Sequence, residues 1–157
     1  MNRDNDFQCD RYSKQRIMEA MKERYKPNIF KYEIDENPKA IIDCMAIGIT
    51  NDGKVIHYAI ECKQRNFTAD KYDAYYCEPS KYQSLLFETI YNGVDRAYVA
   101  NEFSDGSIYL WNINDLDPNE TEDVRIARTT VGVGEYLSER IMQKRILMHK
   151  DKAIKIK

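Results

Sequence analysis

The feature that most constrains the fold of this chain is a tight turn, Asn51-Asp52-Gly53, set between two apolar runs. The runs span residues 40–50 and 55–63, and each has the pattern of a strand that is buried along most of its length. A turn of this composition between two such runs is a strong signal for an antiparallel hairpin. We therefore expect the chain to build a sheet around this hairpin.

Acidic and basic side chains interrupt the two strands of the hairpin at only two places. Asp43 lies inside the first strand, and the second strand ends in Glu61-Cys62-Lys63. Side chains two residues apart in a strand face the same way, so Glu61 and Lys63 share one face while Cys62 points to the other. Charged groups in apolar strands need a partner, a metal ion or water, which makes Asp43 the natural partner of this pair.

The length of the hairpin loop decides whether Asp43 meets Glu61. A two-residue loop would put the two carboxylates on opposite faces of the sheet. A three-residue loop pairs Thr50 with Lys54 and places Asp43 directly opposite Glu61. Such a loop ends in the left-handed region of backbone conformation, which favours glycine, and Gly53 stands at that position. The sequence therefore predicts the three-residue loop.

The rest of the chain alternates between helical and extended patterns. The expected elements are a helix over 13–25, a strand over 29–35, the hairpin, a polar loop over 66–78, a helix introduced by Pro79 and closed by Gly93, strands over 94–101, 107–113 and 124–130, and a helix over 135–148. This order, αβββαββ plus a C-terminal helix, predicts an α/β (α+β) fold with a central mixed β-sheet flanked by helices. We expect one domain over 1–157, with a core at about 13–113 and a C-terminal extension at about 114–157.

Charge and hydropathy limit the partners of the protein. The net charge is -2, whereas proteins that bind nucleic acids usually carry an excess of Lys and Arg. A local basic face can still come from the C-terminal segment, although a solvated helix end explains its charges about equally well. The cations of that segment are Arg140, Lys144, Arg145, Lys150, Lys152, Lys155 and Lys157. The absence of a long apolar run and of a signal peptide predicts a cytoplasmic protein with no membrane partner.

Asp43, Glu61 and Lys63 are a sufficient set for phosphodiester hydrolysis. Two carboxylates on one face bind a hard cation such as Mg²⁺ or Mn²⁺, which activates water and neutralises the phosphate. A lysine beside the ion can orient that water or help to deprotonate it. The alternative is a partly buried Asp–Lys ion pair at the end of the sheet, with no catalytic role.

This arrangement resembles the PD-(D/E)xK nuclease superfamily, whose core is a helix, three strands, a helix and a strand in the restriction-endonuclease-like fold. The resemblance covers roughly residues 13–113 and rests on Asp43 and on the Glu61-Cys62-Lys63 motif. It implies that Asp43 and Glu61 hold the metal ion and that Lys63 assists the water nucleophile. It also implies the main-chain carbonyl of Cys62 as a further metal ligand.

The resemblance extends to residues around this motif. A carboxylate of the first helix often joins the site in that superfamily, and Glu19 or Glu23 can fill the place, with Glu23 favoured. The second helix contains Gln83-Ser84-Leu85-Leu86-Phe87, similar to the Gln-x-x-x-Tyr motif of RecB-like exonucleases, with Phe87 where that motif has tyrosine. Apart from the resemblance, the candidate substrate contacts include residues close to the proposed site, which can touch phosphate oxygens: Gln64, Arg65 and Lys81. For each of these three alone, an exposed position without a role is the default interpretation. Gln83, from the Gln-x-x-x-Tyr-like motif, is the fourth candidate.

The sequence thus predicts a Mg²⁺-dependent (or Mn²⁺-dependent) deoxyribonuclease. DNA is the expected partner, with RNA less favoured as a substrate, and a homodimer is left open because cutters of duplex DNA commonly pair two sites. The alternative function is a catalytically inactive restriction-endonuclease-like module that binds nucleic acid or a protein partner. The choice between endonuclease and exonuclease is also left open.

Overall fold

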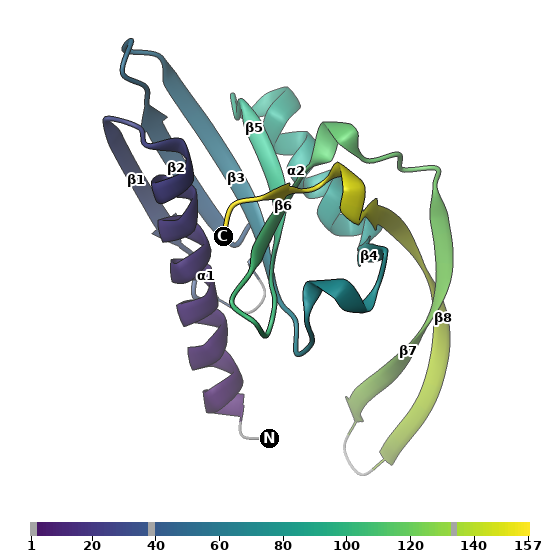
Figure 1. Cartoon of the computed structure of the whole chain (residues 1–157). Coiled ribbons are helices and arrows are strands. Elements are labelled where there is room, and N and C mark those ends of the chain that lie inside the picture. Colours follow the sequence, from purple (N-terminus) through teal and green to yellow (C-terminus); the bar gives the residue numbers. More distant parts are fainter. Residues whose placement is uncertain (1–2, 38–39, 133–134) are drawn as a thin grey trace.

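A mixed six-stranded sheet forms the centre of the molecule (Figure 1), as the computed structural model describes it for residues 3–37, 40–132 and 135–157. Its strands lie in the order β1-β2-β3-β5-β6-β9. Their bounds are β1 Ile29–Ile34, β2 Cys44–Ile49, β3 Val55–Gln64, β5 Arg96–Glu102, β6 Ile108–Asn112 and β9 Ile154–Lys155. The pair β3–β5 is parallel, and every other pair in this sheet is antiparallel.

Two helices, α1 (Arg3–Tyr25) and α2 (Pro79–Tyr91), pack on opposite faces of this sheet. The face under α1 is apolar because Ile17 and Met18 are fully buried there against alternate residues of β3, such as Ile60. The intervening residues of β3 face α2, whose Leu85 is fully buried in the second core. Burial of both faces explains why the pattern of this strand is nearly continuous rather than alternating.

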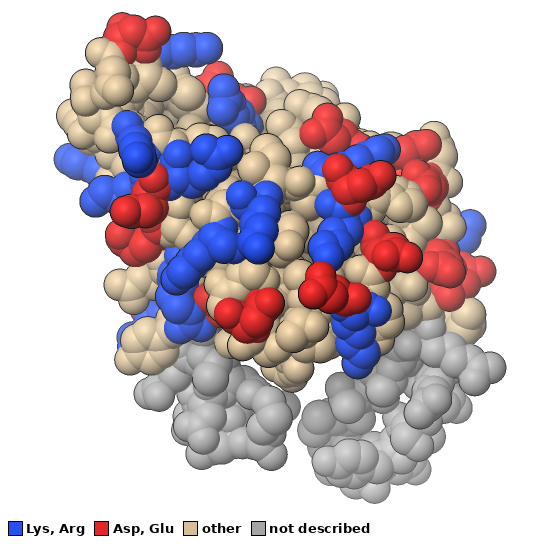
Figure 2. All heavy atoms as spheres, viewed as in Figure 1, with Lys and Arg blue, Asp and Glu red and all other residues tan. Residues whose placement is uncertain are grey.

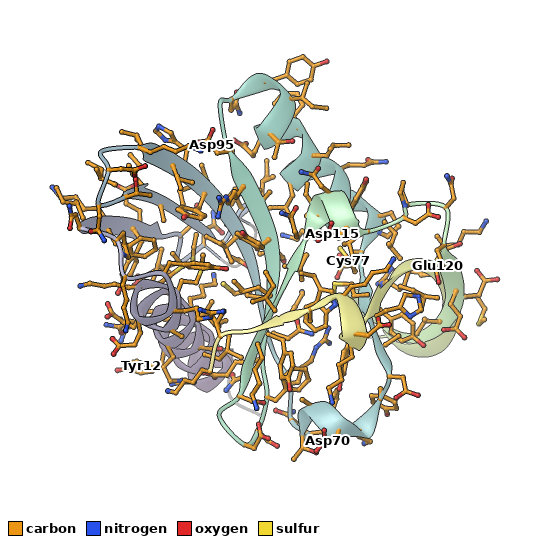
Figure 3. The ribbon with its side chains drawn as sticks, turned by 45° about the horizontal axis from the view of Figure 1, so that its top comes forward. Tyr12, Asp70, Cys77, Asp95, Asp115 and Glu120 are labelled. Carbon is orange, nitrogen blue, oxygen red and sulfur yellow. The ribbon has the colours of Figure 1, made fainter. Side chains whose placement is uncertain are left out.

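A second, three-stranded sheet lies beside α2, in the order β4-β8-β7. Its strands are β4 Ala74–Cys77, β7 Thr121–Gly132 and β8 Glu135–His149, and the last two form a long hairpin that curves away on the side opposite α1 (Figure 1). Figure 3 shows Cys77 of β4 in the interior between α2 and this hairpin. Single turns of 3₁₀ helix connect the strands at Ala69–Lys71, Ile113–Asp115 and Lys150–Lys152.

The C-terminal helix expected over 135–148 is wrong, because this segment is the strand β8. Its apolar residues Ile146 and Met148 are two apart and both buried, and they pair with Cys77 and Tyr75 of β4. The segment 66–78, expected as a loop, contains β4, so neither partner of this pair was recognised. A strand held by a distant partner has no signal in its own local sequence.

The other expected elements are present with shifted ends. The fold class is confirmed as α+β with a mixed central sheet flanked by two helices. The first helix begins well before Ser13, the start that the sequence predicts, and Ser13 is buried inside α1. The first strand of the hairpin begins only at Cys44. Among the described residues, no helix combines the length and the apolar character that crossing a membrane requires.

Candidate active site

The hairpin has the three-residue loop that the sequence predicts. The backbone N–H of Thr50 donates to the carbonyl of Lys54 at 2.9 Å, and the N–H of Gly53 donates to the carbonyl of Thr50 at 2.9 Å. Gly53 has a φ of +85°, in the left-handed region. A residue with a side chain would be strained at this position, so glycine fixes the length of the loop.

The loop sets a register that brings the two carboxylates together. Cys44 is paired with Ile60, so the next pair beyond the end of β2 is Asp43 with Glu61. Glu61 is 3% exposed. Burial raises the pKa of Glu61 to about 7, and the neighbouring charge of Asp43 is the next largest cause. Two neighbouring carboxylates disfavour a second negative charge in this way.

Asp43 is held by donors on two sides. Its Oδ2 accepts from the backbone N–H of Cys62 at 2.8 Å, and its Oδ1 lies 3.0 Å from Nζ of Lys14 in α1. Lys14 is only 2% exposed, and its Nζ also donates to the carbonyl of Asp35 at 2.9 Å. The sequence expectation of an acid from the first helix did not include this lysine. The available signal was its position on the buried helix face, three residues before Ile17.

The cations near Glu61 come from the α2 side of the sheet. Nζ of Lys81 lies 3.3 Å from Oε2 of Glu61, and Nζ of Lys63 lies 3.8 Å from Oε1. Oε2 is buried and has no hydrogen-bond partner among the described residues. Lys81 instead donates to the carbonyls of Ala40 and Ile41, which ties the first turn of α2 to the start of the hairpin.

A cleft of about 240 Å³ opens beside Glu61 and Lys63. Its charged lining residues are Glu61, Lys63, Arg65, Glu78, Lys81 and Arg145. Arg145 comes from β8 and was not predicted as a site residue, because its segment was expected to be a C-terminal helix. Figure 2 shows acidic and basic residues interspersed on the face in view. Of the six charged residues that line the cleft, four are cations.

Arg65 brings a buried hydrogen-bond donor to the lining of the cleft. Its Nε is buried with no hydrogen-bond partner in the described part of the chain. Burial also lowers the pKa of its guanidinium. An unpaired donor beside a cleft is a group that a ligand with acceptor oxygens can satisfy.

The remaining sequence-predicted residues lie away from the cleft. Glu19 accepts a hydrogen bond from the hydroxyl of Tyr32 at 2.7 Å, and Glu23 is exposed on α1 beside a different hollow. Gln64 is exposed at the end of β3, where its even-numbered position directs it away from the face of Glu61. Gln83 is exposed on α2 and does not line the cleft.

Two neighbouring carboxylates, those of Asp43 and Glu61, are the candidate side-chain ligands for a metal ion. Among the described residues, no group of three or more His, Cys, Asp or Glu is arranged to hold a metal. The N–H of Cys62 donates to Asp43, and both backbone groups of a strand residue face the same neighbouring strand, so the main-chain carbonyl of Cys62 also faces the side of β2. Asp43 and Glu61 lie next to each other at the end of β2.

Comparison with known proteins gives a likeness at the level of the fold. No protein-family model and no curated protein matches the chain. The structure is similar to that of Archaeoglobus fulgidus Hjc, a Holliday junction resolvase from an archaeal hyperthermophile, with a TM-score of 0.50 and 17% identity. The match covers 88% of this chain and 94% of that chain. The chain therefore has the restriction-endonuclease-like fold that its sequence predicts.

Proposed function

We propose that this protein is a metal-dependent deoxyribonuclease that hydrolyses phosphodiester bonds in the cleft beside Glu61 and Lys63. The observation that carries the proposal is the convergence of Asp43 and Glu61 from neighbouring strands, with Lys63 on the face of Glu61. The fold that the chain shares with a Holliday junction resolvase supports DNA, rather than RNA, as the substrate. A fold alone does not fix a function, so the site carries the argument.

Asp43, Glu61 and the main-chain carbonyl of Cys62 would hold Mg²⁺ or Mn²⁺. Oε2 of Glu61 has an ion pair with Lys81 but no hydrogen-bond partner among the described residues, and the pKa of this acid is raised by burial and by the charge of Asp43. A cation held between the two carboxylates would offset this repulsion. The ion, when bound, activates a water molecule and neutralises charge on the phosphate. Water would complete its coordination, as is usual for Mg²⁺ in proteins.

Lys63 is the residue proposed to act on the nucleophile. Its side chain is 39% exposed and lines the cleft, so its ammonium can reach a water molecule there. Nζ would donate a hydrogen bond that orients this water, and its positive charge would offset the negative charge that develops on the phosphate as the P–O bond forms. Its ion pairs with Glu61 and Glu78 are long, at 3.8 and 4.0 Å, which leaves the ammonium free to turn toward a substrate.

The substrate phosphates would be bound by Arg65, Lys81 and Arg145. All three line the cleft, and Nε of Arg65 lacks a hydrogen-bond partner among the described residues. Arginine forms strong, charge-assisted hydrogen bonds with phosphate oxygens. Gln64 and Gln83 would contact the substrate only outside the cleft. Pairing of two chains would supply one site for each DNA strand, and the mass in solution measures whether this homodimer forms.

One observation favours the alternative of a catalytically inactive module that binds DNA or a protein. Asp43 already has a buried cation in Lys14, as a structural ion pair requires. The two candidate functions differ in whether they require a divalent ion. A nuclease cleaves DNA only when the ion is present, whereas the inactive module binds its partner with or without it.

The test is cleavage of plasmid, linear duplex, single-stranded and four-way-junction DNA with Mg²⁺ or Mn²⁺, and with EDTA. We expect cleavage with the ions and none with EDTA. Asp43→Asn and Glu61→Gln should each lower the rate by about a thousandfold or more, because an ion bound at this site supplies several kcal/mol of transition-state stabilisation.

The matched control is Glu33→Gln, which makes the same kind of acid-to-amide change at an exposed position of β1. It should leave the rate unchanged. Failure of the wild-type chain to cut any of the four substrates, at protein concentrations where it remains folded, would refute the nuclease and favour the inactive module.

A further inference from the structure

Lys14 places a positive charge next to Asp43, on the α1 side of the sheet. Its side chain is 3% exposed, its Nζ lies 3.0 Å from Oδ1 of Asp43, and it donates to the carbonyl of Asp35 at 2.9 Å. An ammonium group is rarely buried to this degree unless it is paired, because leaving water is unfavourable for a charge.

The position of Lys14 follows from the spacing of buried residues on α1. Lys14, Ile17, Met18 and Met21 are spaced as one face of a helix, and all four are buried against the sheet. The aliphatic stem of Lys14 therefore packs as part of the core, and only its end is polar. Moving the ammonium away from Asp43 would require the core to open, so this charge is fixed in place.

A fixed ammonium at this point changes how the carboxylate pair receives a divalent ion. Lys14 occupies one side of Oδ1 of Asp43, and the N–H of Cys62 occupies one side of Oδ2. The ammonium also repels any cation that binds between Asp43 and Glu61. Binding of the ion is therefore weakened, and the charge available to attract a second ion is reduced.

We propose that Lys14 is a resident cation of the site, which limits the affinity of the carboxylate pair for divalent ions and restricts it to one ion. The proposal rests on the proposed function only for the identity of the residues that hold the ion. Lys14 does not line the cleft and acts through Asp43, so it is a positioning residue rather than a catalytic one.

The test is Mn²⁺ binding to the full chain by titration calorimetry, for the wild type and for Lys14→Met. Methionine keeps a long apolar stem and removes the charge. We expect the dissociation constant for Mn²⁺ to fall about tenfold or more, since a positive charge a few ångströms from the ion is lost. The melting temperature without metal should fall, while the increase in melting temperature on adding Mn²⁺ should become larger.

The matched control is Lys22→Met, at an exposed position of the same helix. It should leave the affinity for Mn²⁺ unchanged. A merely structural role of Lys14 predicts a lower melting temperature with the same affinity for Mn²⁺, and that result would overturn the proposal. Uptake of a second Mn²⁺ at the carboxylate pair of the wild-type chain would overturn its one-ion part.

A second variant covers the case in which Lys14→Met does not fold. In Lys14→Gln the amide can still donate one hydrogen bond but carries no charge, so the same gain in Mn²⁺ affinity is expected. If both variants are unfolded without metal, circular dichroism should show that Mn²⁺ restores their structure. Failure of saturating Mn²⁺ to do so would contradict the proposal.

The test of Lys14 can succeed or fail independently of the proposed function, because it measures binding of Mn²⁺ and not cleavage of DNA. A chain that binds Mn²⁺ with the expected dependence on Lys14 but cuts no DNA refutes the nuclease and supports the resident cation. A chain that cuts DNA, with an affinity for Mn²⁺ that does not respond to Lys14→Met, supports the nuclease and refutes the resident cation. If neither the wild type nor the variants bind Mn²⁺, the resident cation is refuted.

Discussion

The two sides of the carboxylate pair are built differently. On the α1 side, Lys14 is 2% exposed and lies 3.0 Å from Asp43, inside a continuous hydrophobic core. On the α2 side, the side chains of Lys63 and Lys81 are 39% and 23% exposed, and they lie 3.8 and 3.3 Å from Glu61. One side therefore carries a fixed charge, and the other carries charges that can move and exchange partners.

The difference follows from where the two helices begin and end. α1 packs on the sheet and buries Lys14 on the same helix face as Ile17, Met18 and Met21. α2 begins only at Pro79, so its first turn lies at the end of β3 and the cleft opens beside that turn. Buried charges define structure, whereas partly exposed charges beside a cleft are available to a substrate. This comparison predicts different consequences for removing each cation.

The largest effect on cleavage among the cations is expected for Lys63. Lys63→Met should lower kcat by about a hundredfold or more, because it removes the group that orients the water and offsets charge on the phosphate. The free energy of unfolding should change little, since its ion pairs are long and partly exposed. Steady-state cleavage with saturating Mn²⁺ measures the first quantity, and urea unfolding measures the second. An unchanged kcat would remove Lys63 from the mechanism.

The geometry behind the prediction for Lys63 was readable from the sequence. Gly53 fixes the loop, the loop fixes the register, and the two-residue period of a strand places Glu61 and Lys63 on one face. Each of these steps depends on residues close together in the chain. The confirmed position of Asp43 opposite Glu61 shows that a local turn can determine contacts at the far end of a hairpin.

The position of Arg145 could not be predicted in the same way. Its strand β8 is held by β4, more than sixty residues earlier, and by the neighbouring strand β7. Its local sequence also fits a helix with an apolar face, so only knowledge of the distant partner distinguishes the two. The sequence therefore predicts a basic segment that includes Arg145, but not the position of Arg145 in the cleft.

Lys14 was missed for a different reason. Its helix was recognised, but the helix was expected to begin at Ser13, which placed Lys14 in the first turn. The actual helix begins at Arg3, so Lys14 lies in its interior on the same face as Ile17. A lysine on a buried face is unusual enough to be a signal once the helix is correctly placed.

The next largest effect is a difference in the free energy of unfolding between variants on the α1 side and on the α2 side of the carboxylate pair. Lys14→Met should lower the free energy of unfolding without metal by about 3 kcal/mol, because it leaves Asp43 partly buried beside Glu61 without its cation. Lys81→Met should lower it by about 1 kcal/mol or less, because that side chain is more exposed. Urea unfolding in EDTA measures both. Equal losses for the two variants would contradict the division into a fixed and an exchangeable side.

A smaller effect is expected for substrate binding by β8. Arg145→Gln should raise KM about tenfold and leave kcat nearly unchanged, because a charge-assisted hydrogen bond to phosphate contributes about 1.5–3 kcal/mol. The dependence of binding on salt should also weaken by about one phosphate contact. The control is Lys144→Gln, the exposed neighbour on the same strand, which does not line the cleft. Similar changes in KM for both variants would indicate general charge rather than a site contact.

The smallest effect concerns the acid that the resemblance led us to expect from the first helix. Glu23→Gln should change the rate of cleavage and the affinity for Mn²⁺ by no more than about twofold, as for an ordinary surface substitution. Glu23 is exposed on α1, whereas the residue of α1 that reaches Asp43 is Lys14. Calorimetry with Mn²⁺ and a cleavage assay measure the two quantities. A tenfold loss of Mn²⁺ affinity in this variant would mean that α1 rearranges to supply a third carboxylate, and Lys14 could not then keep its place beside Asp43.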